Sequence, residues 1–223
     1  MSGFFAPDSA AMRFLTRIAD LMILNLLFIA TSIPIVTLGA SVTALNFTAM
    51  RIVRGQCDSV TGDYFGSFRR NFRQATLIGL IFLLLAAVFG AWFIVITNLN
   101  VDGIVELILL AIWYLVAFAF ALNLIFVFPY LANFEGTTRE VLRNSRLMSW
   151  RHPLTAVVAF AIVALSIVVT VFYPQATAYG ILWLLIGFAG IAFLSGVLFT
   201  RVFDRYAPQP TPDVPSDDPS DEE

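Results

Sequence analysis

Long apolar runs separated by short polar segments dominate the chain. Four of these runs have clear limits, at 75–97, 104–132, 153–173 and 179–200. Each is at least as long as the roughly 20 residues that a helix needs to cross the hydrocarbon core of a bilayer. Backbone groups find no water inside lipid, so segments that cross it must satisfy their own hydrogen bonds as helices. The pattern therefore predicts four transmembrane helices, arranged as two hairpins.

A fifth apolar stretch, 18–50, is interrupted in its middle by Pro34 and Gly39. Proline lacks a backbone N–H and clashes with the preceding turn, so we expect the helix to break there. Glycine adopts conformations that other residues avoid, which suits a turn. The half after the break also carries polar side chains, and it should face protein or a wet cavity rather than lipid. These side chains are Ser41, Thr43, Asn46 and Thr48.

Arginines flank this broken stretch on both sides, with Arg13 and Arg17 before it and Arg51 and Arg54 after it. Cytoplasmic flanks of membrane helices carry an excess of basic residues, so both ends are expected in the cytoplasm. That arrangement favours a helical hairpin, re-entrant or only just spanning. A single crossing with an external amino terminus is the alternative.

The same rule orients the other helices. Arginines gather in 51–74, 133–152 and 201–223, whereas the connections 98–103 and 174–178 contain none. The three basic segments are expected in the cytoplasm and the two short turns outside. We therefore predict an all-α, polytopic membrane protein with a broken N-terminal hairpin, four further transmembrane helices, and a cytoplasmic carboxyl terminus.

Two of the basic segments have helical periodicity. In 63–74, aromatic side chains share one face beside three arginines, and Thr61 or Asp63 could cap the start. In 137–150, apolar positions recur at three- and four-residue spacing among three arginines, and His152-Pro153 ends the helix. Such helices lie at the headgroup level or offer a surface to a partner protein. The candidate lipid or partner contacts are Phe65, Phe68, Arg69, Arg70, Phe72, Arg73, Arg139, Arg143 and Arg146.

The composition agrees with a membrane protein and sets the tail apart. Of the 223 residues, 59% are hydrophobic and 13% charged, whereas soluble domains have about 45–50% apolar and about 25% charged residues. Residues 207–223 combine prolines with acids and contain no basic residue, so we expect a disordered cytoplasmic tail after one helical domain at 1–206.

Residues suited to catalysis or metal binding are scarce. The chain has one cysteine, Cys57, and one histidine, His152, which excludes a multi-histidine metal site. It has no phosphate-binding glycine loop and no nucleophile elbow, and all 13 basic residues are arginine. We expect no enzyme activity, no cofactor, no metal and no nucleic-acid partner. The centres of the four clear spans lack ionisable residues, which disfavours a proton-coupled pump.

Several short motifs resemble the YesL family of bacterial integral membrane proteins. The resemblance is specific over about residues 12–80 and looser as far as about 203. Its strongest part includes Asn25, Pro34, Thr37 and Gly39, the signature residues of the helix break. The motifs are Asn25-Leu26-Leu27, the run 33–40, Thr43-Ala44-Leu45, Arg54-Gly55, the run 63–76, Phe128-Pro129 and Trp150-Arg151-His152-Pro153.

The resemblance implies a bacterial inner (plasma) membrane location and an unknown biochemical function. Members of that family tend to be encoded beside sugar ABC-transporter components, which implies a role near carbohydrate uptake. Our first hypothesis is a non-enzymatic accessory of such a transport system, with ABC-transporter components and the lipid bilayer as partners. The alternative is a small transporter or channel for a neutral polar solute at the Pro34–Gly39 break. The sequence leaves the oligomeric state open.

Overall fold

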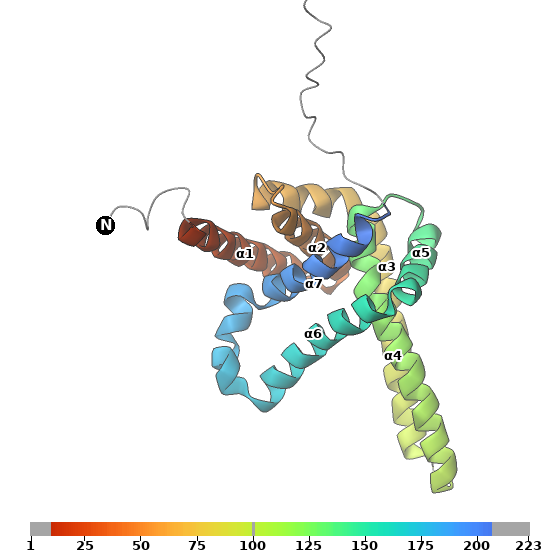
Figure 1. The fold of residues 1–223 in the computed structure, drawn as a ribbon. Helices are drawn as coiled ribbons and strands as arrows, with labels where there is room; N and C mark the ends of the chain where they lie inside the picture. The colour runs from red at the N-terminus through yellow and green to blue at the C-terminus, as the bar shows by residue number, and fades with distance from the viewer. Residues whose placement is uncertain (1–9, 100, 207–223) are drawn as a thin grey trace, which may run out of the picture.

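The computed structural model describes residues 10–99 and 101–206, except for the side chains of Ala10, Thr177 and Tyr179. Every regular element in this part of the chain is helical (Figure 1). The elements are α1 (Ala10–Ser32), η1 (Ile35–Thr37), α2 (Leu38–Arg54), α3 (Val60–Asn98), α4 (Gly103–Asn133), α5 (Thr138–Arg151), α6 (Pro153–Phe172), η2 (Pro174–Gly180), η3 (Trp183–Gly187) and α7 (Phe188–Phe203).

Within the described residues, six helical segments are long and apolar enough to cross a membrane. They comprise α1, η1 with α2, α3, α4, α6, and η3 with α7. The predicted all-α polytopic fold, with a broken N-terminal pair and four later spans, is therefore confirmed. The acidic tail at 207–223, and with it the predicted domain boundary after 206, lies outside the described residues.

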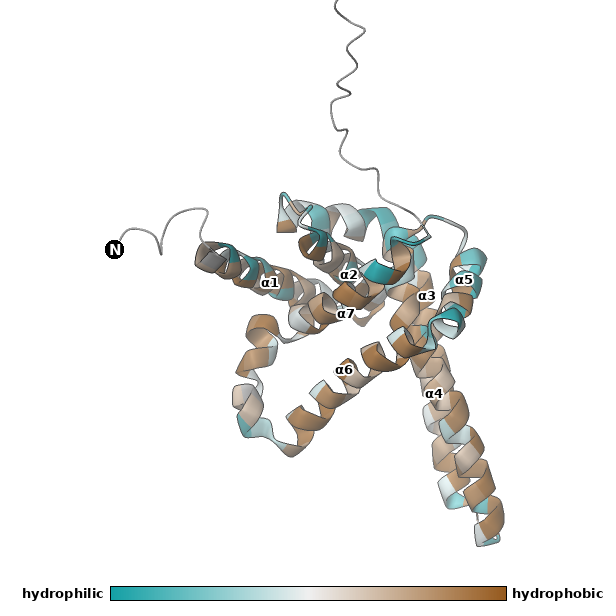
Figure 2. Ribbon diagram, in the orientation of Figure 1, coloured by the Kyte–Doolittle hydropathy of each residue, from teal (hydrophilic) through white to brown (hydrophobic). Residues whose placement is uncertain are grey.

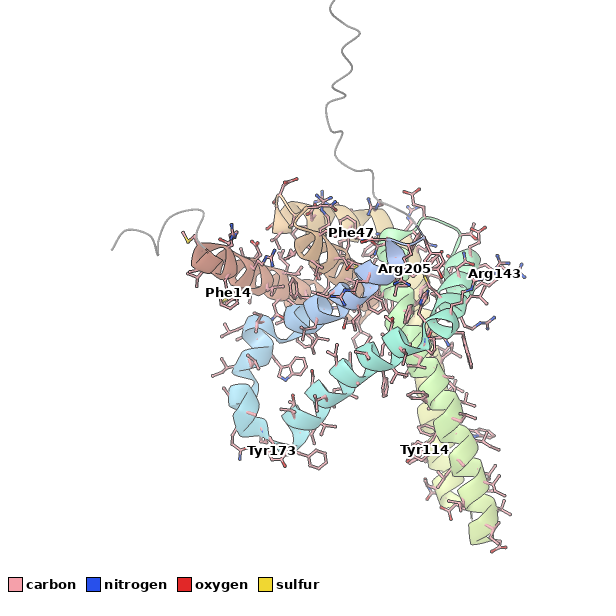
Figure 3. The ribbon with its side chains drawn as sticks, in the orientation of Figure 1. Phe14, Phe47, Tyr114, Arg143, Tyr173 and Arg205 are labelled. Atoms are coloured by element: carbon pink, nitrogen blue, oxygen red, sulfur yellow. The ribbon has the colours of Figure 1, made fainter. Side chains whose placement is uncertain are left out.

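Polar and apolar surfaces separate along the molecule. Apolar residues cover α6 and the long pair of α3 and α4, whereas polar residues gather on α5, at the start of α3 and at the end of α7 (Figure 2). Arg143 and Arg205 lie at this polar end, and Tyr114 and Tyr173 lie toward the opposite end (Figure 3). We call it the arginine-rich end below.

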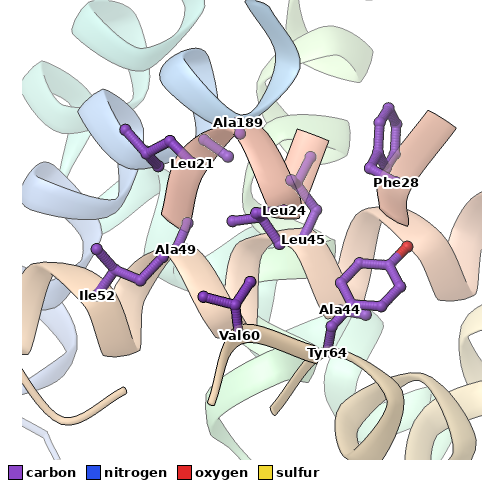
Figure 4. Packing of buried hydrophobic residues seen from close by; sticks show 11 residues of the cluster. Leu21, Leu24, Phe28, Ala44, Leu45, Ala49, Ile52, Val60, Tyr64 and Ala189 are labelled. Carbon is purple, nitrogen blue, oxygen red and sulfur yellow. The ribbon is translucent and has the colours of Figure 1, made fainter. Parts of the chain in front are cut away.

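Helices α1 and α2 form an antiparallel pair. Leu21, Leu24 and Phe28 of α1 belong to one buried cluster with Leu45 and Ile52 of α2. The order of these side chains along one helix is the reverse of their order along the other (Figure 4). The amino end of α1 and the carboxyl end of α2 therefore lie at the same end of the pair, as the hairpin interpretation requires.

The contact between α2 and α3 depends on two glycines. A Cβ on Gly39 would overlap the carbonyl oxygen of Ala75, and a Cβ on Gly79 would lie 3.0 Å from the Gly39 Cα. Small residues allow helix backbones to approach this closely inside membranes. Gly39 is itself helical, so the turn conformation we expected of it is wrong: its lack of a side chain serves packing.

Helix α3 joins the predicted amphipathic helix 63–74 to the following span as one helix of 39 residues. Its initial part runs across the arginine-rich end, and its remainder descends beside α4 (Figure 1). Ser59 caps the start by accepting a hydrogen bond of 3.2 Å from the Gly62 N–H, so neither Thr61 nor Asp63 is the cap.

The last two spans are joined through η2 and pack together near Ala156 and Phe199. The apolar run predicted at 179–200 is not a uniform helix. It contains η3, a single π-helical stretch, directly before α7. A π turn of this kind interrupts the regular ladder of helix hydrogen bonds and is frequent at functional sites.

Candidate functional site

The helix break forms where the sequence predicts it. Pro34 is extended, with φ −75° and ψ 118°, between α1 and η1. The Thr37 hydroxyl lies 2.6 Å from the Thr31 carbonyl oxygen and 2.7 Å from the Pro34 carbonyl oxygen, so it closes the turn. The Thr31 hydroxyl lies in turn 2.5 Å from the Tyr64 hydroxyl of α3. This chain of hydroxyls ties the break to the next helix.

Asn25, another signature residue, lies about two turns before the end of α1 and is fully buried. Its Nδ2 donates hydrogen bonds to the carbonyl oxygens of Trp183 (2.9 Å) and Leu184 (2.8 Å). Its Oδ1 accepts a bond of 3.0 Å from the Ala189 N–H. One side chain thus satisfies three backbone groups around the π turn and fastens α1 to α7. The sequence pattern contains no sign of this partner, which lies more than 150 residues away.

The polar side chains of α2 are mostly occupied within their own helix. The hydroxyls of Ser41, Thr43 and Thr48 donate to the carbonyl oxygens four residues earlier, at 3.1, 2.9 and 3.0 Å. All three residues are buried. The expectation that this arm faces protein is confirmed, but these hydroxyls are not presented to a solute.

An apolar cavity of about 490 Å³ lies beside the break. Its walls come from α1, η1, α2, α3, α4, α6, η3 and α7. The break contributes Ile35 and Gly39, and the π turn contributes Trp183. Polar lining side chains are few, and they include Asn46 and Ser195.

The aromatic face predicted on 63–74 does not lie wholly on lipid. Phe65 and Phe68 pack against the buried clusters of the protein, and Phe72 remains exposed. Tyr64, which we did not single out, is the most deeply buried ring of this segment. Arg69 and Arg73 are exposed beside Phe72.

Helix α5 confirms the amphipathic helix expected at 137–150. Val141, Ser145 and Met148 are buried, and its start is a complete capping box. Glu140 accepts a bond of 2.8 Å from the Thr137 N–H, and the Thr137 hydroxyl accepts one of 3.4 Å from the Glu140 N–H. The bond from the Thr137 N–H, and next a bond of 2.9 Å from the Thr137 hydroxyl to the same carboxylate, hold the pKa of Glu140 below its ordinary value. The Thr-x-x-Glu pattern was a readable signal for this cap.

Eight arginines of α2, α3 and α5 at the arginine-rich end fall into two groups. Arg51, Arg54 and Arg70 line a polar pocket of about 430 Å³. There Arg54 pairs with Asp204 at 2.7 Å and Arg51 pairs with Asp63 at 2.9 Å. The Arg51 and Arg70 guanidinium groups both lie over the Phe47 ring, 5.9 and 5.1 Å from its centre. Arg70 therefore belongs to this pocket rather than to the open face.

The second group is exposed and forms no ion pair with any described residue: Arg69, Arg73, Arg139, Arg143 and Arg146. Gln74 of α3 donates a bond of 2.9 Å to the Gly136 carbonyl oxygen, just before α5. Val141 of α5 packs in one cluster with Ala75 of α3. These contacts bring the two arginine-bearing helices together. We call the five arginines the basic face.

Cys57 lies between α2 and α3 and is half-buried. Burial raises the pKa of its thiol to about 12, with a further increase from the hydrogen bond and negative charge of Asp63. A thiol with this pKa is almost fully protonated at neutral pH and is a poor nucleophile or metal ligand. Among the described residues, no group of three or more His, Cys, Asp or Glu side chains could hold a metal ion.

Residues 21–93 match a protein-family model described as "Protein of unknown function, DUF624". YesL proteins belong to this family, so the match supports the resemblance at this coarser level. The matched segment contains the helix break, the Gly39–Gly79 contact and the start of α3. Comparison with curated proteins and with solved structures finds no match. The chain is a multi-pass helical membrane protein with similarity to a family of unknown function.

Proposed function

We propose that the protein is a non-enzymatic accessory of a bacterial transport system, located in the plasma membrane with its arginine-rich end in the cytoplasm. The basic face carries this proposal. Five exposed guanidinium groups, on two helices held together by Gln74 and Val141, form no ion pair with described residues. Such a surface complements an acidic face on a cytoplasmic protein. The association with carbohydrate uptake and with ABC-transporter components rests on the resemblance to the YesL family.

Affinity purification from native membranes tests this proposal. A tagged protein should recover a permease or ATPase subunit, and substituting Arg139, Arg143 and Arg146 together by Gln should reduce that recovery at least tenfold. The matched control replaces Arg13 and Arg17 by Gln, because both are exposed near the amino end of α1 and do not belong to the basic face. Recovery of the protein alone would overturn the accessory role. Equal recovery by both variants would show that the basic face contacts only lipid headgroups.

The alternative function, transport of a neutral polar solute through the break, receives less support from the geometry. The cavity beside Pro34 and Gly39 is lined mainly by hydrocarbon, which does not compensate the lost hydration of a sugar. The hydroxyls of Ser41, Thr43 and Thr48 are bonded to their own backbone. Sugar uptake by liposomes that contain only this protein, abolished by substitution of Pro34, would restore this alternative.

A further inference from the structure

The apolar cavity is larger than a packing defect. Its volume of about 490 Å³ lies within the range of about 300–1,000 Å³ that is typical of small-molecule sites. Its walls include Phe28, Phe120 and Phe199 together with aliphatic side chains from α2, α3 and α6. A lining of this kind favours the contact of hydrocarbon over that of water. The elements around it belong to the membrane-spanning part of the chain, so its natural occupants come from the bilayer.

Two polar groups in this wall lack partners. Asn46 is 8% exposed, and its Nδ2 donates to the Val42 carbonyl oxygen at 2.8 Å, which leaves its Oδ1 as a free acceptor. Ser195 is 6% exposed. Within residues 10–99 and 101–206, neither the Asn46 Oδ1 nor the Ser195 hydroxyl, both on residues that line the cavity, forms a hydrogen bond. A ligand that supplies a partner to these groups forms hydrogen bonds that hydrocarbon cannot offer, and so gains affinity.

We propose that this cavity binds a membrane-derived molecule that has one hydrocarbon chain and a hydroxyl group. The hydroxyl donates to the Asn46 Oδ1 or bonds to the Ser195 hydroxyl, and the chain contacts the aromatic and aliphatic wall. A hydroxyl is the smallest group that both donates and accepts, so it matches this pair of groups. A purely apolar molecule would leave both of them unsatisfied.

The two helix irregularities lie at the edge of the same cavity. Ile35 and Leu38 follow the Pro34 break, Trp183 begins the π turn, and Phe188 follows it. Asn25 holds the π turn in place through its bonds to Trp183, Leu184 and Ala189. These interruptions of regular helix shape the cavity wall, which gives the signature residues Asn25 and Pro34 a positioning role at a binding site.

Tryptophan fluorescence provides the test, because Trp183 lines the cavity whereas Trp92 is 56% exposed and does not line it. The protein is placed in bilayer nanodiscs as two single-tryptophan forms: W92F/W113F/W150F keeps Trp183, and W113F/W150F/W183F keeps Trp92. A brominated long-chain alkanol and the brominated alkane of the same length are then added. Bromine quenches the tryptophans that it contacts, and Trp92 reports the concentration in the surrounding lipid.

Quenching of Trp183 should saturate, with half-quenching at an alkanol mole fraction at least fivefold lower than that of the alkane. Quenching of Trp92 should rise in proportion to the added probe. Ala86 and Ala87 are both exposed, but only Ala86 lines the cavity, so Ala86→Phe should abolish saturation and Ala87→Phe should leave it unchanged.

Ser195→Ala and Asn46→Leu should each bring the ratio of the two half-quenching mole fractions, alkane to alkanol, closer to one. Ser195→Ala removes a single oxygen, so it keeps the test valid if Asn46→Leu fails to fold. Proportional quenching at both tryptophans would overturn the site. Saturable quenching with equal affinity for alkanol and alkane would overturn the assignment of the hydroxyl. Neither result depends on a protein partner, so the test is separate from that of the accessory role.

Discussion

Asn25 on α1 and Ala189 on α7 are 164 positions apart and are joined by a hydrogen bond of 3.0 Å from the Ala189 N–H to the Asn25 Oδ1. The same amide donates to two carbonyl oxygens of the π turn. A side chain that inserts into a helix in this way takes the place of the missing ladder bonds. Asn25 therefore acts as the connection between the family-matched amino-terminal part and the last span.

Substitution of Asn25 by Leu should destabilise the protein strongly. The change removes the bonds of Asn25 to the Trp183 and Leu184 carbonyl oxygens and to the Ala189 N–H, and we expect a loss of about 2–4 kcal/mol in the free energy of unfolding. Unfolding in mixed micelles measures this loss. Asn123→Leu is the matched control, because Asn123 bonds only to the Ala119 carbonyl oxygen of its own helix. An effect no larger than that of the control would show that the Asn25 bonds contribute little.

Gly39→Ala should weaken the contact between α2 and α3. A methyl group at this position overlaps the Ala75 carbonyl oxygen, which is backbone and cannot rotate away. Overpacking of this kind costs about 1–3 kcal/mol. The same substitution at Gly90, a helical glycine with nothing within 4 Å of the added Cβ, should be neutral or slightly stabilising. Thermal unfolding measures the stability of both variants. Equal melting temperatures would contradict the close-packing role of Gly39.

The sequence predicts the elements of this fold better than their contacts. Apolar run lengths place the spans, Pro34 places the break, and the period of 137–150 identifies α5. These features follow from local composition and the dimensions of the bilayer. Gly39 illustrates the limit: a glycine five positions after a proline suggests a turn residue, and only the approach of α3 reveals its packing role.

The candidate site depends more on distant contacts. Arg70 reads as one of three equivalent arginines on 63–74, but the structure places it over the Phe47 ring of α2. Phe65 and Phe68 read as lipid-facing, but α1 and α2 supply the buried surface that covers them. The cavity itself is made by eight elements, so no local pattern could reveal it. The Thr137–Glu140 cap differs, because both partners lie within one short motif.

Alkylation of Cys57 should be slow at neutral pH. The pKa of about 12 keeps the thiol protonated, so the rate should continue to rise with pH well beyond 9, whereas an ordinary cysteine levels off near its pKa of about 8.5. Asp63→Asn removes a negative charge beside the thiol, which lowers the pKa and should increase the rate at pH 8. Maleimide labelling measures both effects. The control is Asp58→Cys with Cys57→Ser, a fully exposed thiol one position away. A Cys57 rate that levels off at pH 9 would contradict the raised pKa.

The antiparallel pair of α1 and α2 predicts that residues 12 and 58 lie on the same side of the membrane. Arg13 and Arg17 before the pair and Arg51 and Arg54 after it favour the cytoplasm for that side. Single thiols at Met12, Asp58 and Asp102, each in a Cys57→Ser background, can be labelled in intact cells with an impermeant maleimide. Only the thiol at Asp102, between α3 and α4, should react from outside, and all three should react after the membrane is opened. External labelling at Met12 would show that the chain crosses an odd number of times before α3, and the hairpin interpretation would be wrong.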